Sequence, residues 1–181
     1  MTSHTRTVLL VTMSLAFGST HAVAAQTPAP TAASVPTLPT LEIRTADLVA
    51  DYFAAEPATA ARGAVVVLGG SEGGLDGSRA ISRRLAADGF DALAVSYFGE
   101  PGQSEKLDLI PIEPVARALA WLDSRPQGTE PIAVVGVSKG GELALLTGSR
   151  NPHIAAVIAA VPSNVVWAGI DRTGGSVGSS W

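Results

Sequence analysis

The chain has 181 residues, a formal net charge of −4 and a hydrophobic fraction of 46%. This is enough apolar material for one globular domain with a core of its own. The slightly acidic balance gives no reason to expect a nucleic acid as partner. The absence of cysteine excludes disulfide bonds and thiolate metal sites, and nothing in the pattern requires a cofactor or another metal.

The first 24 residues are typical of a secretory signal peptide. Arg6 supplies the positive charge, residues 8–17 form a short apolar run, and Ala22-Val23-Ala24 is an A-x-A cleavage signature. The run is too short for a stable membrane span, so an uncleaved anchor is the weaker alternative. We therefore expect an exported protein, periplasmic or secreted, whose mature chain begins near Ala25.

Residues 25–40, rich in Pro, Ala and Thr, are predicted to be a disordered linker. The rest of the chain, residues 41–181, alternates apolar runs with helical patterns. Two short strands should open it as an antiparallel pair, and buried strands should then alternate with helices. The expected strands are 41–44, 48–53, 65–68, 91–98, 132–137 and 154–161; the expected helices are 78–88, 112–124 and the segment that ends at 150.

This alternation predicts a mostly parallel sheet with helices on both faces. In the helix at 112–124, an apolar stripe recurs at Val115, Ala118, Leu119 and Leu122. In such sheets, sites lie at the carboxyl ends of the strands. That rule places the ends of the strands near residues 69–77, 97–99, 138 and 162–164 along one rim.

Three stretches match the pattern Gly-x-Ser-x-Gly, centred on Ser71, Ser138 and Ser176. Ser176 lies in a Gly-rich tail without a strand before it, and after Ser71 more glycines delay any helix. Only Ser138 has an apolar strand directly before it and a helix directly after it. Strand, sharp turn and helix together indicate a nucleophile elbow, so Ser138 is the candidate nucleophile, with a structural Gly-rich turn as the alternative.

A serine that attacks an acyl carbon needs backbone N–H groups that face the developing oxyanion. One donor should be the amide of Lys139, which follows the nucleophile. The other should come from the Gly-rich loop at 69–74, from Ser71 or Glu72. A flexible Gly-rich turn is the alternative for this loop. Nucleotide binding is a weaker alternative, because neither Gly-rich segment has the required spacing.

The other members of a Ser, Asp or Glu, and His triad are harder to find. His153 is the only histidine after the predicted leader, and it opens the last strand, at the end opposite the rim. Asp171 could be an acid, but no histidine follows it; Glu142 reads as an ordinary solvated charge. We therefore expect that the triad Asp and His are not in this chain, and that it is a fragment lacking the C-terminal part of its sheet.

Five strings of this sequence resemble the C-terminal catalytic domain of acyl-CoA thioester hydrolases and bile acid-CoA:amino acid N-acyltransferases. The strings are LGGSEGG (68–74), AVSYFGEPG (94–102), LIPIE (109–113), VVGVSKGGELALL (134–146) and VPSNVVW (161–167). The resemblance covers about residues 41–181. It implies a partial α/β-hydrolase domain, with Ser138 as the nucleophile and the family's Asp and His further downstream.

The resemblance also implies acyl transfer from a thioester, and amino-acid conjugation in this family goes with Cys at the nucleophile. Ser138 therefore favours hydrolysis of a small-molecule ester or thioester. Acyl-CoA is intracellular, which conflicts with the predicted export, so a dienelactone-hydrolase-like or general carboxylesterase activity is the alternative. A non-catalytic binding remnant that keeps the rim without a triad is the alternative of another class.

Overall fold

The computed structural model describes residues 7–11, 39–56, 61–125 and 130–181, and residues 7–11 by their backbone alone. Most of the predicted signal peptide and linker lies outside these residues. The boundaries at 24 and 40 therefore stay predictions.

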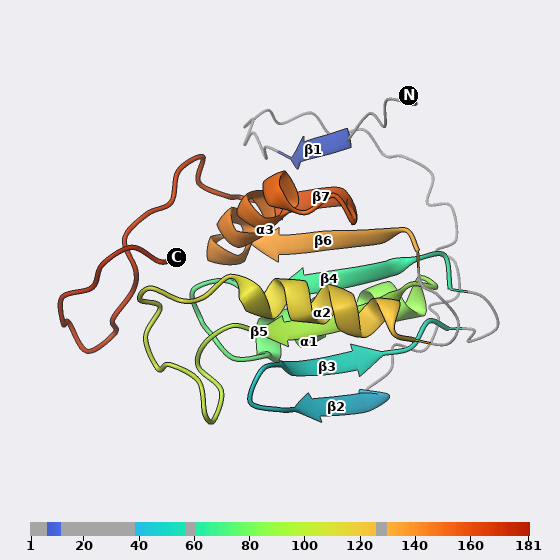
Figure 1. Cartoon of the computed structure of the whole chain (residues 1–181), viewed down its shortest axis with the longest axis horizontal. Coiled ribbons are helices and arrows are strands. Elements are labelled where there is room, and N and C mark those ends of the chain that lie inside the picture. Colours follow the sequence, from blue (N-terminus) through green and yellow to red (C-terminus); the bar gives the residue numbers. More distant parts are fainter. Residues whose placement is uncertain (1–6, 12–38, 57–60, 126–129) are drawn as a thin grey trace, which may run out of the picture.

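One seven-stranded sheet, in the order β1-β7-β6-β4-β5-β3-β2, organises the described residues (Figure 1). β2 and β3 form an antiparallel pair, β3 runs antiparallel to β5, and the other neighbours are parallel. The antiparallel opening pair and the parallel centre are as predicted. The strands are β1 (Thr7–Val11), β2 (Leu41–Arg44), β3 (Val49–Phe53), β4 (Ala64–Leu68), β5 (Asp91–Ser96), β6 (Ile132–Val137) and β7 (Ile154–Ala160).

Among the described residues, three helices cover the two faces of this sheet: α1 (Asp76–Ala87), α2 (Glu113–Asp123) and α3 (Lys139–Arg150). Figure 1 shows α2 in front of the strands and α1 behind them. The larger core cluster joins the strands to α2 and α3, and a smaller one joins them to α1. The apolar stripe predicted for α2 is confirmed, because its four members are its buried residues.

The helix after β4 differs from its predicted start. α1 begins at Asp76, with Leu75 in the N-cap position, and Ser78 lies inside the first turn. The Ser78 hydroxyl is buried and donates to the Leu75 carbonyl oxygen at 3.0 Å. The helix therefore starts two residues before the predicted position, and the Ser78 side chain bonds back to the carbonyl three residues earlier instead of to the free amides at the helix start.

β1 lies within the predicted signal peptide and pairs in parallel with the outer edge of β7, with Thr7 opposite Ala156 and Val11 opposite Ala160. This pairing belongs to the chain with its first residues in place. It says nothing about cleavage, so export stays a prediction.

Candidate active site

Ser138 occupies the sharp turn between β6 and α3. Its backbone has φ 51° and ψ −115°, and α3 begins at the next residue. A positive φ is rare for a residue with a side chain and marks a strained turn. The side chain is exposed, and the Ser138 N–H donates to the Ala160 carbonyl oxygen of β7 at 2.9 Å. Strand, strained serine and helix follow one another as an elbow requires.

The glycines on either side of Ser138 are required by backbone contacts. A Cβ on Gly136 would overlap the carbonyl oxygen of Gly140. A Cβ on Gly140 would overlap the carbonyl oxygen of Gly69 and lie 2.6 Å from that of Leu68. The backbones of β6, α3 and the end of β4 therefore approach too closely for any side chain at either position.

The Gly-rich loop after β4 lies directly against Ser138. The position that a Cβ on Gly70 would take is 3.5 Å from the Ser138 Cβ. Within residues 61–125 and 130–181, the amides of Ser71, Glu72 and Lys139 donate no hydrogen bond to another protein group. The structure thus brings the predicted oxyanion loop to the predicted nucleophile and leaves the candidate N–H groups free.

Tyr97, which sequence reasoning did not single out, supports this loop from below. Its hydroxyl donates to the carbonyl oxygens of Gly69 at 2.8 Å and Gly70 at 3.0 Å. Burial raises the pKa of Tyr97, and the negative charges of Glu72 and Glu142 raise it further, so the hydroxyl stays protonated and remains a donor. The only signal was its position, at the carboxyl end of the predicted strand 91–98, which the sequence placed at the rim.

Lys139 and Glu142 form a buried ion pair beside the elbow. The Lys139 ammonium donates to Glu142 Oε2 at 3.2 Å, to Ser180 Oγ at 2.8 Å and to the Ala168 carbonyl oxygen at 3.1 Å. The interpretation of Glu142 as a solvated charge is therefore wrong. Its burial depends on the C-terminal segment that folds back over the first turn of α3, which no local pattern predicts.

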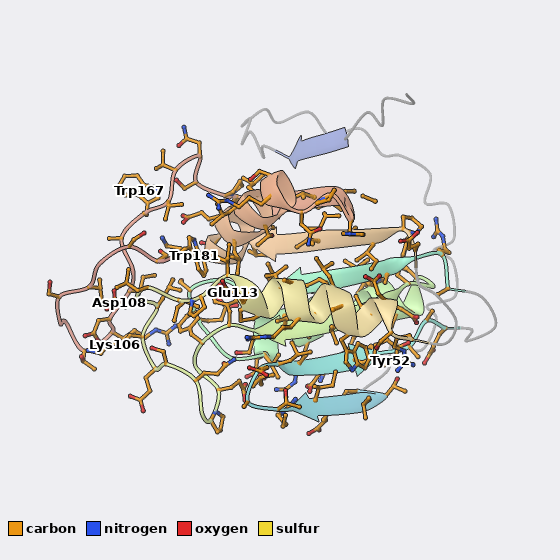
Figure 2. The ribbon with its side chains drawn as sticks, in the orientation of Figure 1. Tyr52, Lys106, Asp108, Glu113, Trp167 and Trp181 are labelled. Atoms are coloured by element: carbon orange, nitrogen blue, oxygen red, sulfur yellow. The ribbon has the colours of Figure 1, made fainter. Side chains whose placement is uncertain are left out.

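The C-terminal segment, residues 161–181, returns across the rim of the sheet. It pairs with the loop after β5 through Ile170 and Leu107, and Arg172 Nη2 donates to the Ser71 carbonyl oxygen at 2.8 Å. The Trp181 ring lies 5.2 Å from the Tyr97 ring, centroid to centroid. Figure 2 shows Trp181 turned toward the sheet and Trp167 on the outer side of the segment. The predicted loop around Ser176 belongs to this segment.

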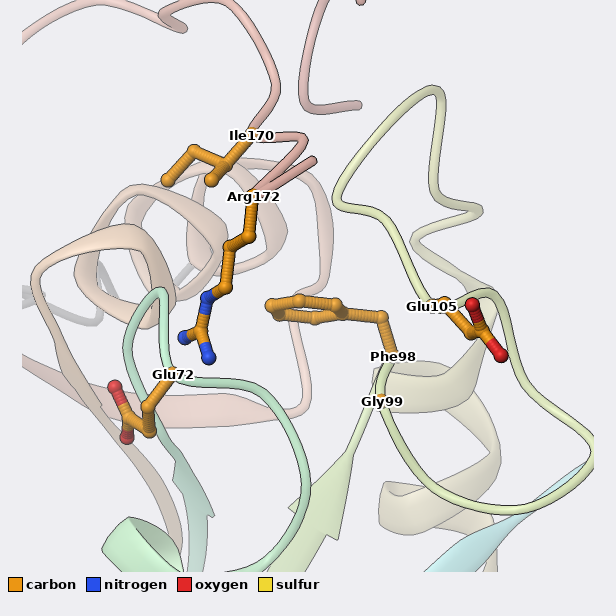
Figure 3. Close-up of a pocket in the computed structure, with 6 residues that line it drawn as sticks. All are labelled: Glu72, Phe98, Gly99, Glu105, Ile170 and Arg172. Carbon is orange, nitrogen blue, oxygen red and sulfur yellow. The ribbon is translucent and has the colours of Figure 1, made fainter. Parts of the chain in front are cut away.

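A small pocket of about 180 Å³ lies between the segment and the rim (Figure 3). Arg172 points from the segment toward the loop that carries Glu72, and Phe98 closes one side. The other lining residues are Gly99, Glu105 and Ile170. The pocket is therefore lined by the Gly-rich loop and by charged and aromatic side chains.

Neither candidate partner for Ser138 faces it. His153, the one histidine in the described residues, is exposed and precedes β7 at the end of the sheet away from Ser138. Asp171 pairs with Lys106 Nζ at 2.7 Å, and this hydrogen bond and those from Thr173 hold the pKa of Asp171 well below its usual range. Asp171 is thus occupied in an ion pair, and a base for Ser138 is not found among the described histidines.

The described residues offer no candidate for a metal site or for a membrane-spanning helix. The described residues contain no group of three or more His, Cys, Asp and Glu side chains that could hold a metal ion. Among the described helices, none combines the length and apolar character of a membrane span.

Comparison with known families bears on the chain from residue 110 onward. Residues 110–173 match the family model described as BAAT / Acyl-CoA thioester hydrolase C terminal. The family resemblance is confirmed for this part of the chain. Acyl-coenzyme A thioesterase 3 of Mus musculus is 35% identical over 75 residues, which are 41% of this chain and 17% of that protein.

Several solved structures share the fold of this chain. A putative dienelactone hydrolase from Klebsiella pneumoniae has a TM-score of 0.56 at 19% identity, over 74% of this chain and 60% of that one. The α/β hydrolase GrgF from Penicillium sp. has a TM-score of 0.53 at 22% identity, over 64% and 41%. The esterase Pf2001 of Pyrococcus furiosus has a TM-score of 0.54 at 19% identity, over 64% and 44%. The chain has an α/β-hydrolase-type fold and spans between two fifths and three fifths of these chains.

Proposed function

We propose that the protein is a serine hydrolase that cleaves an acyl thioester or ester through an acyl-enzyme on Ser138. The observation that carries the proposal is the strained backbone of Ser138, φ 51° and ψ −115°, between two glycines that admit no side chain. Strain of this kind persists only where the surrounding structure enforces it, and it is concentrated at functional sites. Here it presents one hydroxyl at the rim.

The loop opposite Ser138 supports the proposal, because it could stabilise the oxyanion that forms during the reaction. Attack on the acyl carbon places negative charge on the carbonyl oxygen, which preorganised N–H groups stabilise. In the proposed mechanism the amide of Lys139 and an amide of Ser71 or Glu72 meet this oxygen. All three amides are free of acceptors in the described residues, and Tyr97 and Arg172 hold the carbonyl side of the loop.

The proposed substrate is a small acyl thioester. Support comes from the family match over residues 110–173 and from the likeness to a mouse acyl-coenzyme A thioesterase. A carboxylic ester is the alternative, in keeping with the folds of a putative dienelactone hydrolase and an esterase. Hydrolysis rates on an acyl-CoA and on short p-nitrophenyl esters, compared at equal concentration, distinguish the two.

Covalent labelling tests the nucleophile directly. In the complete protein, a fluorophosphonate probe should modify Ser138, as read by mass spectrometry of the digested protein, and Ser138→Ala should abolish the modification. Ser71→Ala and Ser176→Ala are matched controls, because each removes the hydroxyl of another Gly-x-Ser-x-Gly stretch. Labelling that survives Ser138→Ala and disappears in Ser71→Ala would overturn the choice of nucleophile.

The missing base gives a second test. A serine hydroxyl is a weak nucleophile without an adjacent base, so residues 25–181 should turn over substrate poorly. A version of the gene product read on to the stop codon should be more active if an Asp and a His follow. Equal activity of the two, unaffected by His153→Ala, would point to a base elsewhere in residues 25–181. Absence of activity and of labelling in both would favour the non-catalytic binding remnant.

Export remains part of the proposal. It is supported by Arg6, the apolar run at residues 8–17 and the A-x-A signature before Ala25. N-terminal sequencing of the mature protein should begin at Ala25 or within a residue or two. A mature cytoplasmic protein that retains Met1 would contradict it.

A further inference from the structure

The Glu72 side chain folds back over its own loop. Its Oε1 accepts the Gly70 N–H at 2.9 Å. A Cβ on Gly69 would lie 3.0 Å from Oε1, one on Gly70 2.7 Å from Oε2, and one on Gly77 would overlap Oε1. The carboxylate thus fills the space that three missing side chains leave open, and this accounts for three of the glycines around β4 and α1.

This carboxylate is a neighbour of the nucleophile. The same position above Gly70 that lies 2.7 Å from Glu72 Oε2 lies 3.5 Å from the Ser138 Cβ. Gly77 belongs to the first turn of α1, so Glu72 also lies at a helix N-terminus, where negative charge is stabilised. Its charge raises the pKa of Tyr97, whose hydroxyl holds the carbonyl oxygens of Gly69 and Gly70.

Glycine-rich loops sample many backbone conformations, whereas oxyanion donors must be fixed before the reaction. Tyr97 holds the carbonyl groups of this loop, and Glu72 holds the Gly70 amide. With the Gly70 amide occupied, the amides of Ser71 and Glu72 are the ones in this stretch of the loop that have no protein acceptor among the described residues. A side-chain acceptor at residue 72 therefore decides which N–H groups of the loop are presented.

We infer that Glu72 is a positioning residue, whose side-chain oxygen fixes the Gly70 amide and thereby orients the oxyanion loop toward Ser138. The inference rests on the proposed function and deepens it. What the loop needs from residue 72 is an acceptor oxygen at that distance, and a negative charge is not required.

The first experiment measures, in the complete protein, the rate at which a fluorophosphonate labels Ser138 in Glu72→Gln and Glu72→Ala. Glutamine keeps the acceptor oxygen, so its maximal labelling rate should stay within about threefold of the original. Alanine should lower the maximal labelling rate about 10- to 100-fold, with little change in the half-saturating probe concentration. This fall is smaller than the one expected for the loss of a whole oxyanion donor. Equal losses in both variants would show that the charge matters and would overturn the inference.

A second variant displaces the carboxylate without altering Glu72. Gly77→Ala places a methyl group on Glu72 Oε1, while alanine is the better residue inside α1. Gly77→Ala should slow the labelling of Ser138 although the thermal midpoint of unfolding does not fall. Added to Glu72→Ala, it should slow the labelling no further. Additive losses in the double variant would contradict a shared route through the carboxylate.

The third readout is independent of catalysis. Amide hydrogen exchange at Gly70, followed by NMR, should be slow in the original protein and in Glu72→Gln, and faster in Glu72→Ala, which lacks the acceptor oxygen. A Gly70 amide that exchanges equally fast in all three proteins would overturn the inference even where Ser138 is labelled. If residue 72 protects the Gly70 amide but Ser138 is never labelled, the proposed function fails and Glu72 only holds the loop, without a catalytic role.

Discussion

Two turns of this protein share the pattern Gly-x-Ser-x-Gly and lie side by side at the ends of neighbouring strands. The turn after β6 holds Ser138 at φ 51° and leads at once into α3. In the turn after β4, the positive φ values fall on Gly73 and Gly74 and not on Ser71, and α1 begins only at Asp76. The same five-residue pattern therefore strains the serine in one turn and leaves it unstrained in the other.

The contacts of the glycines explain this difference. Around Ser138 the missing side chains would meet backbone, which cannot move aside. Around Ser71 the first two glycines face the end of the flexible Glu72 side chain. One turn is thus shaped by close-packed backbones and presents a hydroxyl, whereas the other is shaped by a side chain and presents amides. Four predictions test this comparison.

The largest effect is expected for the first glycine of each turn. Gly136→Ala should lower the free energy of unfolding by about 3 kcal/mol or more, because the added methyl group overlaps the backbone of Gly140. Gly69→Ala should change it by about 1 kcal/mol or less, because the Glu72 carboxylate can move. Urea denaturation of the two variants measures both values. Equal losses would mean that the two turns are equally tight.

Removal of the Tyr97 hydroxyl should affect only the turn after β4. Tyr97→Phe leaves the buried carbonyl groups of Gly69 and Gly70 without this donor and should cost about 1–3 kcal/mol of unfolding free energy. It should also slow the labelling of Ser138, because the oxyanion loop loses a support. Unchanged stability and labelling would show that water or another group replaces the hydroxyl.

Backbone strain at the two serines can be compared directly. The free energy of unfolding of Ser138→Gly should exceed that of Ser138→Ala by about 1 kcal/mol, because glycine adopts a positive φ without strain. At Ser71, alanine should be at least as stable as glycine, because φ there is not positive. Thermal denaturation of the four variants gives the two differences. The same sign at both positions would refute the strain assigned to the elbow.

The smallest effect is expected where the C-terminal segment is attached near the Ser71 turn. The hydrogen bond from Lys106 holds the pKa of Asp171 below its ordinary value, so this pair stabilises the folded chain above that value. The contribution is lost as the pH falls through the lowered pKa of the folded state. At pH 7, trypsin should cleave after Arg172 slightly faster in Asp171→Asn than in the original protein. At strongly acid pH, where an acid protease replaces trypsin, the original and the variant should be cleaved in this segment at the same rate. Cleavage that is equally fast at pH 7 would mean that the pair does not anchor the segment.

The sequence by itself determined the parts of this protein that depend on periodic burial. Continuous apolar runs predicted β4 to β7, and spacing along α2 predicted its buried stripe. The flanks of Ser138 separated it from Ser71 and Ser176, and the order of strands and helices placed the rim. These signals are local, because each strand or helix buries a face that its own residues define.

Only the tertiary structure decided which side chains meet at that rim. Lys139 reaches Ser180, 41 residues further on, and Arg172 reaches the loop at Ser71, 101 residues earlier. Glu142, which reads as a solvated charge, is buried by the same return of the chain. Such contacts join segments whose separation in the sequence carries no periodic signal. The sequence therefore predicted where the candidate site lies, while the folded chain decided that Tyr97, Glu72 and Lys139 lie around it.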